Sequence, residues 1–237
     1  MTMSNYGGGF SGGVSIRGVP VLNTYGGEVF WVDSGEGSNG NDGTFGKPWA
    51  TLDYAVGRCT ASRGDIIMVK PGHADTVSAA AGLALDVAGI TIVGIGSGSL
   101  QPTVTLDTII TADIDVDAAN ITIDNINFVA NFADIAVVLD VNATDFTVRN
   151  CRFTQAGADL NAKVCIQDAA AAASDRITVE NCNAIMYDAA NTHFINMAGT
   201  GTGHIVRNNI LQGDWGTMAI GGAGVVTFCQ ITDNVLG

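Results

Sequence analysis

Three aspartates of this chain have a spacing that could support chemistry. Asp113, Asp115 and Asp117 alternate with the apolar residues Ile114 and Val116, so on a β-strand the three carboxylates share one face, about 7 Å from one to the next. Glycoside hydrolysis needs two carboxylates beside the scissile bond, and such oxygen ligands also suit calcium. We interpret the cluster first as a solvated acidic stripe on a β-rich surface. Catalysis and calcium binding are the alternatives.

A repeat of short strands must position these residues. Apolar, β-branched motifs recur along the chain with polar residues in alternation, which predicts strands and a repeat architecture. The central residues of seven copies are 25, 31, 25, 31, 27 and 25 positions apart: Ile67, Ile92, Ile123, Val148, Val179, Val206 and Ile231. One further set of strands is expected between the copies, beginning at Val104, Val137, Val164, Phe194 and Met218. Stacked at about 4.8 Å per turn, the copies predict an all-β fold, a parallel β-helix of about seven rungs.

Polar and sulfur-containing residues repeat with the strands. Cys151 and Cys182 have matching positions in neighbouring copies, and the five cysteines lack disulfide spacing, so we expect a stack of reduced thiols in a reducing cytoplasm. His73, His193 and His204 have no metal-ligand spacing and are expected in turns or at the surface. Four asparagines, each two residues after a strand centre, are expected to form an internal structural ladder, with a polar binding row as the alternative: Asn125, Asn150, Asn181 and Asn208.

The composition suits a solenoid and restricts the partners. The 237 residues include 31 glycines, which suit tight turns, and the net charge is −13. A phosphate-binding surface needs a basic patch, so no nucleic-acid partner is expected. No stretch approaches the apolar length of a membrane span, and the first residues lack the basic and apolar regions of a secretory signal. We therefore expect neither membrane insertion nor secretion.

We divide the chain into three regions. Residues 29–64 are expected to cap the first rung with a strand, a glycine-rich loop and a short helix that buries Trp49, Leu52, Ala55 and Val56. Residues 65–237 form the β-helix, whose C-terminal end has no polar cap and is expected to be covered in an assembly, with truncation as the competing explanation. Residues 1–28 are expected to be an extended arm that binds a partner through Ile16, Arg17, Val19, Pro20, Val21 and Leu22.

Three motifs in the cap and first rung resemble the opening of pectin-lyase-like right-handed parallel β-helix proteins. They read WVDSG at 31–35, NDGTFGKPWATLDYA at 41–55 and GDIIMVKPG at 64–72. The resemblance implies right-handed coiling, and it implies a fold rather than a chemistry, with Asp33, Asp42 and Gly43 as turn residues. Within that superfamily the chain is most similar to small β-helix proteins found in the virions of tailed bacteriophages.

Members of this superfamily often cleave acidic polysaccharides, so their catalytic motifs provide a test. Polygalacturonase-like enzymes carry Gly-Asp-Asp, Gly-His-Gly and Arg-x-Lys motifs. Here His204 follows a glycine but precedes Ile205, and the other two motifs are absent, as is the Trp-x-Asp-His of pectate lyases. We therefore predict no catalytic residue, no metal site and no cofactor.

The combined hypothesis is a non-catalytic structural protein of a bacteriophage, assembled in the host cytoplasm and located in the virion. It would form a homotrimer, decorate the capsid surface, and bind the major capsid protein or another virion subunit. Two alternatives stay open. One is a tailspike-like polysaccharide depolymerase or lyase that uses the acidic stripe. The other is a non-catalytic glycan-binding module that uses Trp215, Tyr187 and Phe132.

Overall fold

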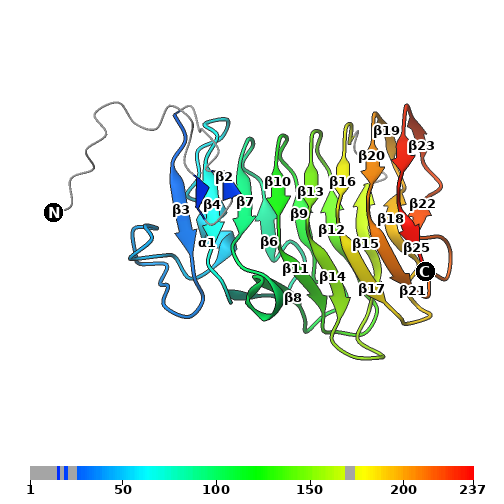
Figure 1. Cartoon of the computed structure of the whole chain (residues 1–237), viewed down its shortest axis with the longest axis horizontal. Coiled ribbons are helices and arrows are strands. Elements are labelled where there is room, and N and C mark those ends of the chain that lie inside the picture. The colour runs from blue at the N-terminus through cyan, green and yellow to red at the C-terminus, as the bar shows by residue number, and fades with distance from the viewer. Residues whose placement is uncertain (1–14, 17–18, 21–25, 169–173) are drawn as a thin grey trace.

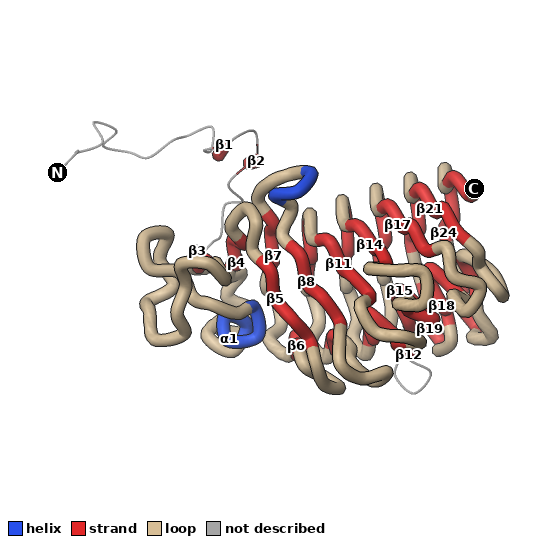
Figure 2. Tube along the Cα trace, turned by 90° about the horizontal axis from the view of Figure 1, so that it is seen from below, coloured by secondary structure: helices blue, strands red, loops and turns tan. Residues whose placement is uncertain are grey.

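A computed structural model of the chain describes residues 15–16, 19–20, 26–168 and 174–237. The chain winds as a parallel β-solenoid in which each turn adds one strand to each of three sheets (Figures 1 and 2). The smallest of these sheets has six strands, so there are six complete turns, with further strands at both ends. The expected all-β parallel β-helix is confirmed, with six complete turns where about seven rungs were predicted. Among the described residues, no helix is long and apolar enough to span a membrane.

The three sheets are parallel throughout, and each collects one strand from successive turns. The eight-stranded sheet contains β3 (Val29–Val32), β4 (Ile66–Val69), β7 (Thr91–Gly94), β10 (Thr122–Asp124), β13 (Thr147–Arg149), β16 (Thr178–Glu180), β20 (Ile205–Arg207) and β24 (Gln230–Thr232). The seven-stranded sheet contains β5 (Ala74–Val77), β8 (Thr103–Leu106), β11 (Asn127–Ala130), β14 (Arg152–Gln155), β17 (Asn183–Met186), β21 (Ile210–Gly213) and β25 (Val235–Leu236). The six-stranded sheet contains β6 (Leu83–Leu85), β9 (Ile114–Val116), β12 (Ile135–Val141), β15 (Ala162–Asp168), β18 (His193–Met197) and β22 (Ile220–Gly221).

The smaller elements lie at the ends and corners of the solenoid. Helix α1 (Leu52–Val56) belongs to the N-terminal cap, and a single 3-10 turn, η1 (Gly98–Leu100), precedes β8. Strands β19 (Thr200–Thr202) and β23 (Val225–Thr227) form a parallel pair near the C-terminal end. Strands β1 (Ser15–Ile16) and β2 (Val19–Pro20) form an antiparallel pair.

The predicted register of the eight-stranded sheet is confirmed along its whole length. Every predicted strand centre lies opposite the next one, from Ile67 against Ile92 to Val206 against Ile231. The inward-facing centres from Ile67 to Val206 are buried in one continuous core. Since a slip of one residue would turn every side chain to the other face of its strand, this apolar column is what fixes the register.

The predicted second set of strands was wrong in one respect, because it merges two sheets. The strand at Val104 belongs to the seven-stranded sheet, whereas those at Val137, Val164 and Phe194 belong to the six-stranded sheet. Most strands of the seven-stranded sheet follow the first sheet after only two residues, as β11 follows β10. Consecutive strands of this kind read as a single apolar run in the sequence, so the bend between them was missed.

The bend is made by a left-handed backbone conformation at a fixed position in five successive turns. Asn125, Asn150, Asn181 and Asn208 have φ between 55° and 60°, and Asp233 has a φ of 56°. Asparagine and aspartate tolerate this conformation better than other residues with a side chain. The chain therefore changes direction between two strands without a glycine at that point.

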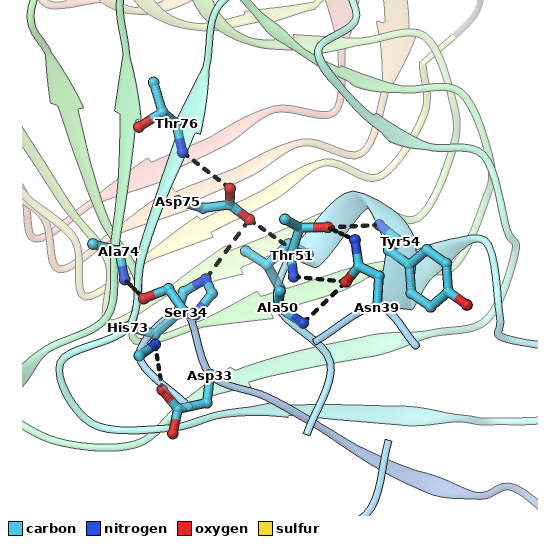
Figure 3. A network of polar contacts seen from close by, with 12 residues as sticks. Asp33, Ser34, Asn39, Ala50, Thr51, Tyr54, His73, Ala74, Asp75 and Thr76 are labelled. Carbon is cyan, nitrogen blue, oxygen red and sulfur yellow. Dashed lines mark hydrogen bonds and ion pairs between the residues drawn. The ribbon is translucent and has the colours of Figure 1, made fainter. Parts of the chain in front are cut away.

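The N-terminal cap closes the first turn through a polar network, shown in Figure 3. Thr51 is the N-cap of α1, and its hydroxyl accepts a hydrogen bond from the Tyr54 amide. The Asn39 side chain accepts from the amides of Ala50 and Thr51. Asp75, on the inward face of β5, reaches up from the solenoid and accepts from the Leu52 amide at 2.8 Å. The first amides of the helix are thus satisfied by side chains of the loop and the solenoid.

The predicted helix is shorter than expected, but its apolar face was correct. Trp49, Leu52, Ala55 and Val56 are all buried in the core. Trp49 itself is extended and pairs with Val32 rather than starting the helix. Because Thr51 takes the N-cap position, the helix begins only at Leu52.

The turn residues of the resembling motif are placed as predicted. The Asp33 carboxylate accepts from the Gly35 amide, and the Asp42 carboxylate accepts from the amide and hydroxyl of Thr44. Gly43 has a φ of 74°, and a Cβ atom there would lie 2.7 Å from the ring of Trp49. The motif therefore serves the packing of the cap tryptophan.

Candidate functional site

The column of four asparagines lies on the outside of the turn rather than in the interior. Asn150, Asn181 and Asn208 are exposed, and Asn125 is half-buried. Their backbone amides donate to the carbonyl of the neighbouring turn, as from Asn150 to Glu180. The Asn150 side chain bonds to Asp124 instead of to another asparagine. The expectation of an internal ladder at these positions was therefore wrong, because their left-handed backbone conformation turns the side chains outward.

The internal ladder lies one residue further along each copy, where the side chain points inward. Cys151, Cys182, Asn209 and Asn234 occupy this column, and each contacts the backbone carbonyl of a strand centre in an earlier turn, from Ile123 to Val206. Asn209 also accepts from the Cys182 amide at 2.9 Å and donates to Asn234 at 2.9 Å. The sequence signal was the cysteine or asparagine that directly follows Asn150, Asn181 and Asn208.

The two cysteines of this ladder are buried thiols, as the stacking prediction required. Burial raises the pKa of Cys182 to about 12 and raises the pKa of Cys151 well above its usual value. Both thiols therefore stay protonated near neutral pH and can donate weakly to the carbonyls beside them. The two thiols therefore do more than fill apolar space, because they also contact backbone carbonyls inside the solenoid.

The acidic stripe lies on one outer face, as predicted. Asp115 is on β9, and in the next turn Asp140 lies directly beside it on β12. The row continues through Gln167 and Asn196 on the following strands. The Gln167 amide lies 3.5 Å from the Asp140 carboxylate, and the Asn196 amide lies 3.3 Å from Gln167. Four side chains from four consecutive turns thus form a polar row across the six-stranded sheet.

The electrostatics of this row set Asp115 apart. Partial burial and the nearby carboxylates of Asp113, Asp117 and Asp140 raise the pKa of Asp115 to about 6. Partial burial also raises the pKa of Asp140 and of Asp113. Like charges so close together disfavour the ionised form, so the row holds a proton up to nearly neutral pH. Among the described residues, no three His, Cys, Asp or Glu side chains converge closely enough to hold a metal ion.

The C-terminal end of the solenoid exposes the column of residues that is buried elsewhere. Leu236 lies in register with Leu211, and Ile231 with Val206. The two inner residues are fully buried, whereas Leu236 is 62% exposed and Ile231 is 49% exposed. A hollow of about 380 Å³ opens on this end between Met218, Ala219, Ile220, Ile231, Asn234 and Leu236.

Other exposed apolar side chains surround this hollow. Phe228 is 90% exposed, and Val225 and Val235 are also well exposed. Strands β22, β24 and β25 are the last strands of the three sheets. We call the exposed residues Val225, Phe228, Ile231, Val235 and Leu236 the C-terminal face. It combines strand edges with exposed apolar side chains, and on soluble proteins a large exposed apolar patch marks an interaction site.

Two histidines are buried in connections between strands, so the predicted turn positions hold for them but surface positions do not. His73 lies under the cap, where its Nε2 is 3.7 Å from the Asp75 carboxylate. His204 lies in the interior, where its Nδ1 accepts from the Ile177 amide and its Nε2 lies 3.3 Å from Asp168. Sequence spacing could not show this for His204, because its partner Asp168 lies 36 residues earlier in the chain. His193 is half-buried.

The surroundings of His204 contain a serine and an aspartate, but not in the order of a catalytic triad. The Asp168 carboxylate accepts from the Ser174 hydroxyl on one side and lies beside His204 on the other. A catalytic triad requires the histidine between the nucleophile and the carboxylate. All three side chains are fully buried, so the cluster is a satisfied polar group of the solenoid core.

The aromatic residues considered for glycan binding have mixed positions. Phe132 and Trp215 are partly buried and pack against the core, Trp215 with its ring 6.4 Å from that of Phe194. Tyr187 is exposed. The three residues do lie on one corner of the solenoid, in the loops between the seven-stranded and the six-stranded sheets. Core packing therefore accounts for two of the three.

The arm residues predicted to bind a partner are described only in part. Ile16 is in β1, and Val19 and Pro20 are in β2. Arg17, Val21 and Leu22 lie outside the described residues.

Comparisons with known proteins give no family for this chain. No family of known proteins and no curated protein matches it. Among solved structures, a rhamnogalacturonan lyase is similar over 89% of this chain and 63% of its own, at 15% identity and a TM-score of 0.48. The GH136 lacto-N-biosidase from Eubacterium ramulus is similar over 88% of this chain and 68% of its own, at 10% identity and a TM-score of 0.38. The chain thus spans less than two thirds of the length of the lyase.

Proposed function

We propose that this chain is a non-catalytic structural protein that associates with another protein subunit through its C-terminal face. The observation that carries the proposal is the exposure, at this end, of residues whose counterparts in the preceding turn are fully buried. Burying an apolar side chain of this size stabilises by about 1.5–3 kcal/mol. Covering several of them would favour a subunit interface.

The setting that we propose is the virion of a tailed bacteriophage, where the protein would decorate the capsid. The motifs of the cap and first rung support this through the resemblance described above. A homotrimer bound to the major capsid protein, or to another virion subunit, is the form of assembly that we propose. The decoration role needs a rigid body with a surface for a partner, and a parallel solenoid with exposed apolar side chains in its last described turn fits that role.

The interface is tested by comparing Ile231→Asp with Ile110→Asp. Both isoleucines are similarly exposed, but Ile231 lies on the C-terminal face while Ile110 lies in the loop between β8 and β9. Size-exclusion chromatography with light scattering, and cosedimentation with particles of the source phage, should show association for the Ile110 variant and loss of association for the Ile231 variant. Equal behaviour of the two variants would refute the C-terminal face as the interface.

The virion setting is tested separately, by quantitative mass spectrometry of gradient-purified particles. A copy number comparable to that of the capsid subunit would support decoration. Absence of the chain from particles would remove the virion setting while leaving the association measurement intact.

One observation favours a second candidate function, cleavage of an acidic polysaccharide. The pKa of Asp115 is raised to about 6, and Asp140 lies directly opposite it on the adjacent strand, about 4.8 Å away across the sheet. A proton-donating acid beside a second carboxylate is the pair that glycoside cleavage uses. Incubation with a panel of acidic polysaccharides should then release reducing ends or unsaturated products, and Asp115→Asn should abolish the release. No product from the unchanged protein across the panel would exclude this candidate.

A further inference from the structure

The outer face of the eight-stranded sheet carries charges of alternating sign in its middle turns. Strands β10, β13, β16 and β20 lie side by side there (Figure 1). In the turns before β10, one outward column of this face holds the buried apolar residues Met68 and Val93. From β10 to β20 every residue of the same column is charged, in the order Asp124, Arg149, Glu180 and Arg207.

Within the chain, this charged column forms two separate ion pairs. Arg149 contacts Asp124 through its Nε at 3.0 Å, and Arg207 contacts Oε2 of Glu180 at 2.6 Å. Arg149 and Glu180 lie opposite each other on β13 and β16, yet in the described part of the chain no hydrogen bond or ion pair joins them. The Nη atoms of Arg149 and the Oε1 atom of Glu180 take no part in the two pairs. Both side chains are only half-buried, so the centre of the column can still bind a partner.

The charged column is complementary to itself under a twofold axis that is parallel to the strands and midway between β13 and β16. Such an axis reverses the direction of the solenoid and keeps the direction of the strands. Each outward column of one copy then faces the same column of the second copy in reverse order. Because the column alternates between acid and base, every charge meets its opposite. Arg149 lies against Glu180 of the second copy, and Asp124 lies against its Arg207.

The rest of the face follows the same rule. Residues 145–150 read DFTVRN and residues 176–181 read RITVEN. The two segments share their threonine and asparagine, and both of their charges are exchanged. The same axis therefore places no like charges together: Asp145 faces Arg176, Thr147 faces Thr178, and Asn150 faces Asn181.

We propose that two copies of this chain associate through this face, with their solenoids antiparallel and with Arg149 of each copy paired to Glu180 of the other. The contact measures about 19 Å along the solenoid and about 20 Å along the strands, which is the size of a small, transient interface. Exposed ion pairs contribute little individually. The dimer is therefore weak and sensitive to salt, and charge matching determines its geometry more than its affinity. The residues involved are separate from the C-terminal face, so this inference does not rest on the function proposed above.

Exchange of charges between copies tests the contact. Sedimentation velocity of the full chain at high protein concentration compares about 0.1 M salt, where a Debye length of about 10 Å screens the repulsion between the net charges, with about 1 M salt, where it is about 3 Å. The unchanged protein should dimerise in the lower salt and dissociate in the higher. Arg149→Glu and Glu180→Arg, each alone, place like charges opposite each other twice and should weaken the association at least about tenfold. An equimolar mixture of the two variants should restore it, because the two altered side chains then face each other.

Matched controls separate this contact from net charge, folding and the C-terminal face. Lys163→Glu changes the net charge as Arg149→Glu does, but Lys163 lies on β15 of the six-stranded sheet, so this variant should dimerise like the unchanged chain. Ile231→Asp should also keep the salt-sensitive dimer. Circular dichroism checks that each variant is folded, and Asp124→Arg with Arg207→Glu repeats the exchange if one of the first pair is not. A monomeric unchanged protein in the lower salt, or a mixture that associates no better than the single variants, would overturn the proposal.

Discussion

The first and last turns of the described solenoid differ in how their apolar column is covered. Any stack of parallel strands ends in unpaired backbone groups and an open apolar column. At the N-terminal end the strap of residues 33–50 and helix α1 cover the column, and Asp75 and Asn39 satisfy the first helix amides. At the C-terminal end the last described turn carries the same column uncovered, with Phe228 and Leu236 exposed. The comparison teaches that the repeat does not cover its own apolar column. Residues outside the repeat are needed to cover it.

Because the cap is buried and the C-terminal face is exposed, substitutions in the two regions should affect different properties of the protein. Residues that cover the N-terminal end are buried and have hydrogen-bond partners, so substitutions there should lower the free energy of unfolding. The side chains of the C-terminal face are exposed, so substitutions there should change association and leave folding almost unaffected. Four predictions test this contrast, or the ladder and acidic row that connect the two ends.

The largest expected effect is the loss of the cap tryptophan. Trp49 packs against Phe30 and Tyr54, and its indole donates to the Asn41 carbonyl at 2.8 Å. Trp49→Ala should lower the free energy of unfolding by about 4 kcal/mol, whereas Leu236→Ala should change it by about 0.5 kcal/mol or less. Urea titrations followed by circular dichroism measure both. Equal losses would mean that the C-terminal face contributes to the folded core.

A smaller loss is expected from the buried carboxylate that anchors the cap. Burial alone would raise the pKa of Asp65, but hydrogen bonds from Arg63 and from the amides of Thr60 and Glu28 outweigh it and hold the pKa below its usual value. Asp65→Asn should cost about 3 kcal/mol at neutral pH.

The lowered pKa of Asp65 gives this prediction a pH dependence. The ionised group stabilises the fold above the pKa of the unfolded chain, about 3.9, and this stability is lost as the pH falls through the lower pKa of the folded state. Unfolding titrations at neutral pH and below pH 4 should therefore show the Asn variant and the unchanged protein converging in acid. A difference that stays constant with pH would contradict the assigned role.

The ladder provides a matched pair of positions, one inside the solenoid and one at its open end. Asn209 is fully buried and bonded to Cys182, Val179 and Asn234. Asn209→Ala should cost about 2 kcal/mol because buried backbone groups lose their partners. Asn234→Ala, at the half-buried end of the ladder, should cost about 1 kcal/mol. Chemical unfolding distinguishes them, and the reverse order would mean that the last turn is more rigid than its exposure implies.

The smallest effect is expected in the acidic row. Because the pKa of Asp115 is raised to about 6, the folded state binds a proton that the unfolded chain releases near pH 3.9. Stability should therefore fall as the pH rises from about 4 through 6. Asp115→Asn should add about 1 kcal/mol or less at pH 8, since solvent screens the partly exposed group, and should add nothing below pH 4. Thermal unfolding across this range is the measurement. A pH profile unchanged by the substitution would contradict the raised pKa.

The repeat made most of the fold predictable, and its failures have physical reasons. The apolar columns fixed the sheet register because only one alignment buries every strand centre. The seven-stranded and six-stranded sheets were predicted as one set. The strands of the seven-stranded sheet are short and follow the first sheet so closely that they give no separate hydrophobic pattern. The ladder was placed one residue early because the sequence shows which residues repeat but not which way a left-handed residue turns its side chain. Asn150 faces solvent for this reason, while Cys151 faces the core.

The candidate sites were predictable to different degrees. The shared face of Asp113, Asp115 and Asp117 follows from strand periodicity alone. Asp140, which completes the row, comes from the next turn, and only the stacking brought it beside Asp115. His73 is buried beside Asp75, and His204 is buried beside Asp168. Asp168 lies 36 residues from His204, a separation at which no local spacing rule applies.

The sequence by itself determined the solenoid, its register and the capped N-terminal end, because each of these follows from local alternation and from short-range turn residues. The tertiary structure alone decided which polar groups became buried partners, which apolar residues of the outer face were covered, and how far the C-terminal face was exposed. These depend on what lies above and below each strand in the stack. That neighbour is about 30 residues away in the chain but only about 4.8 Å away in space.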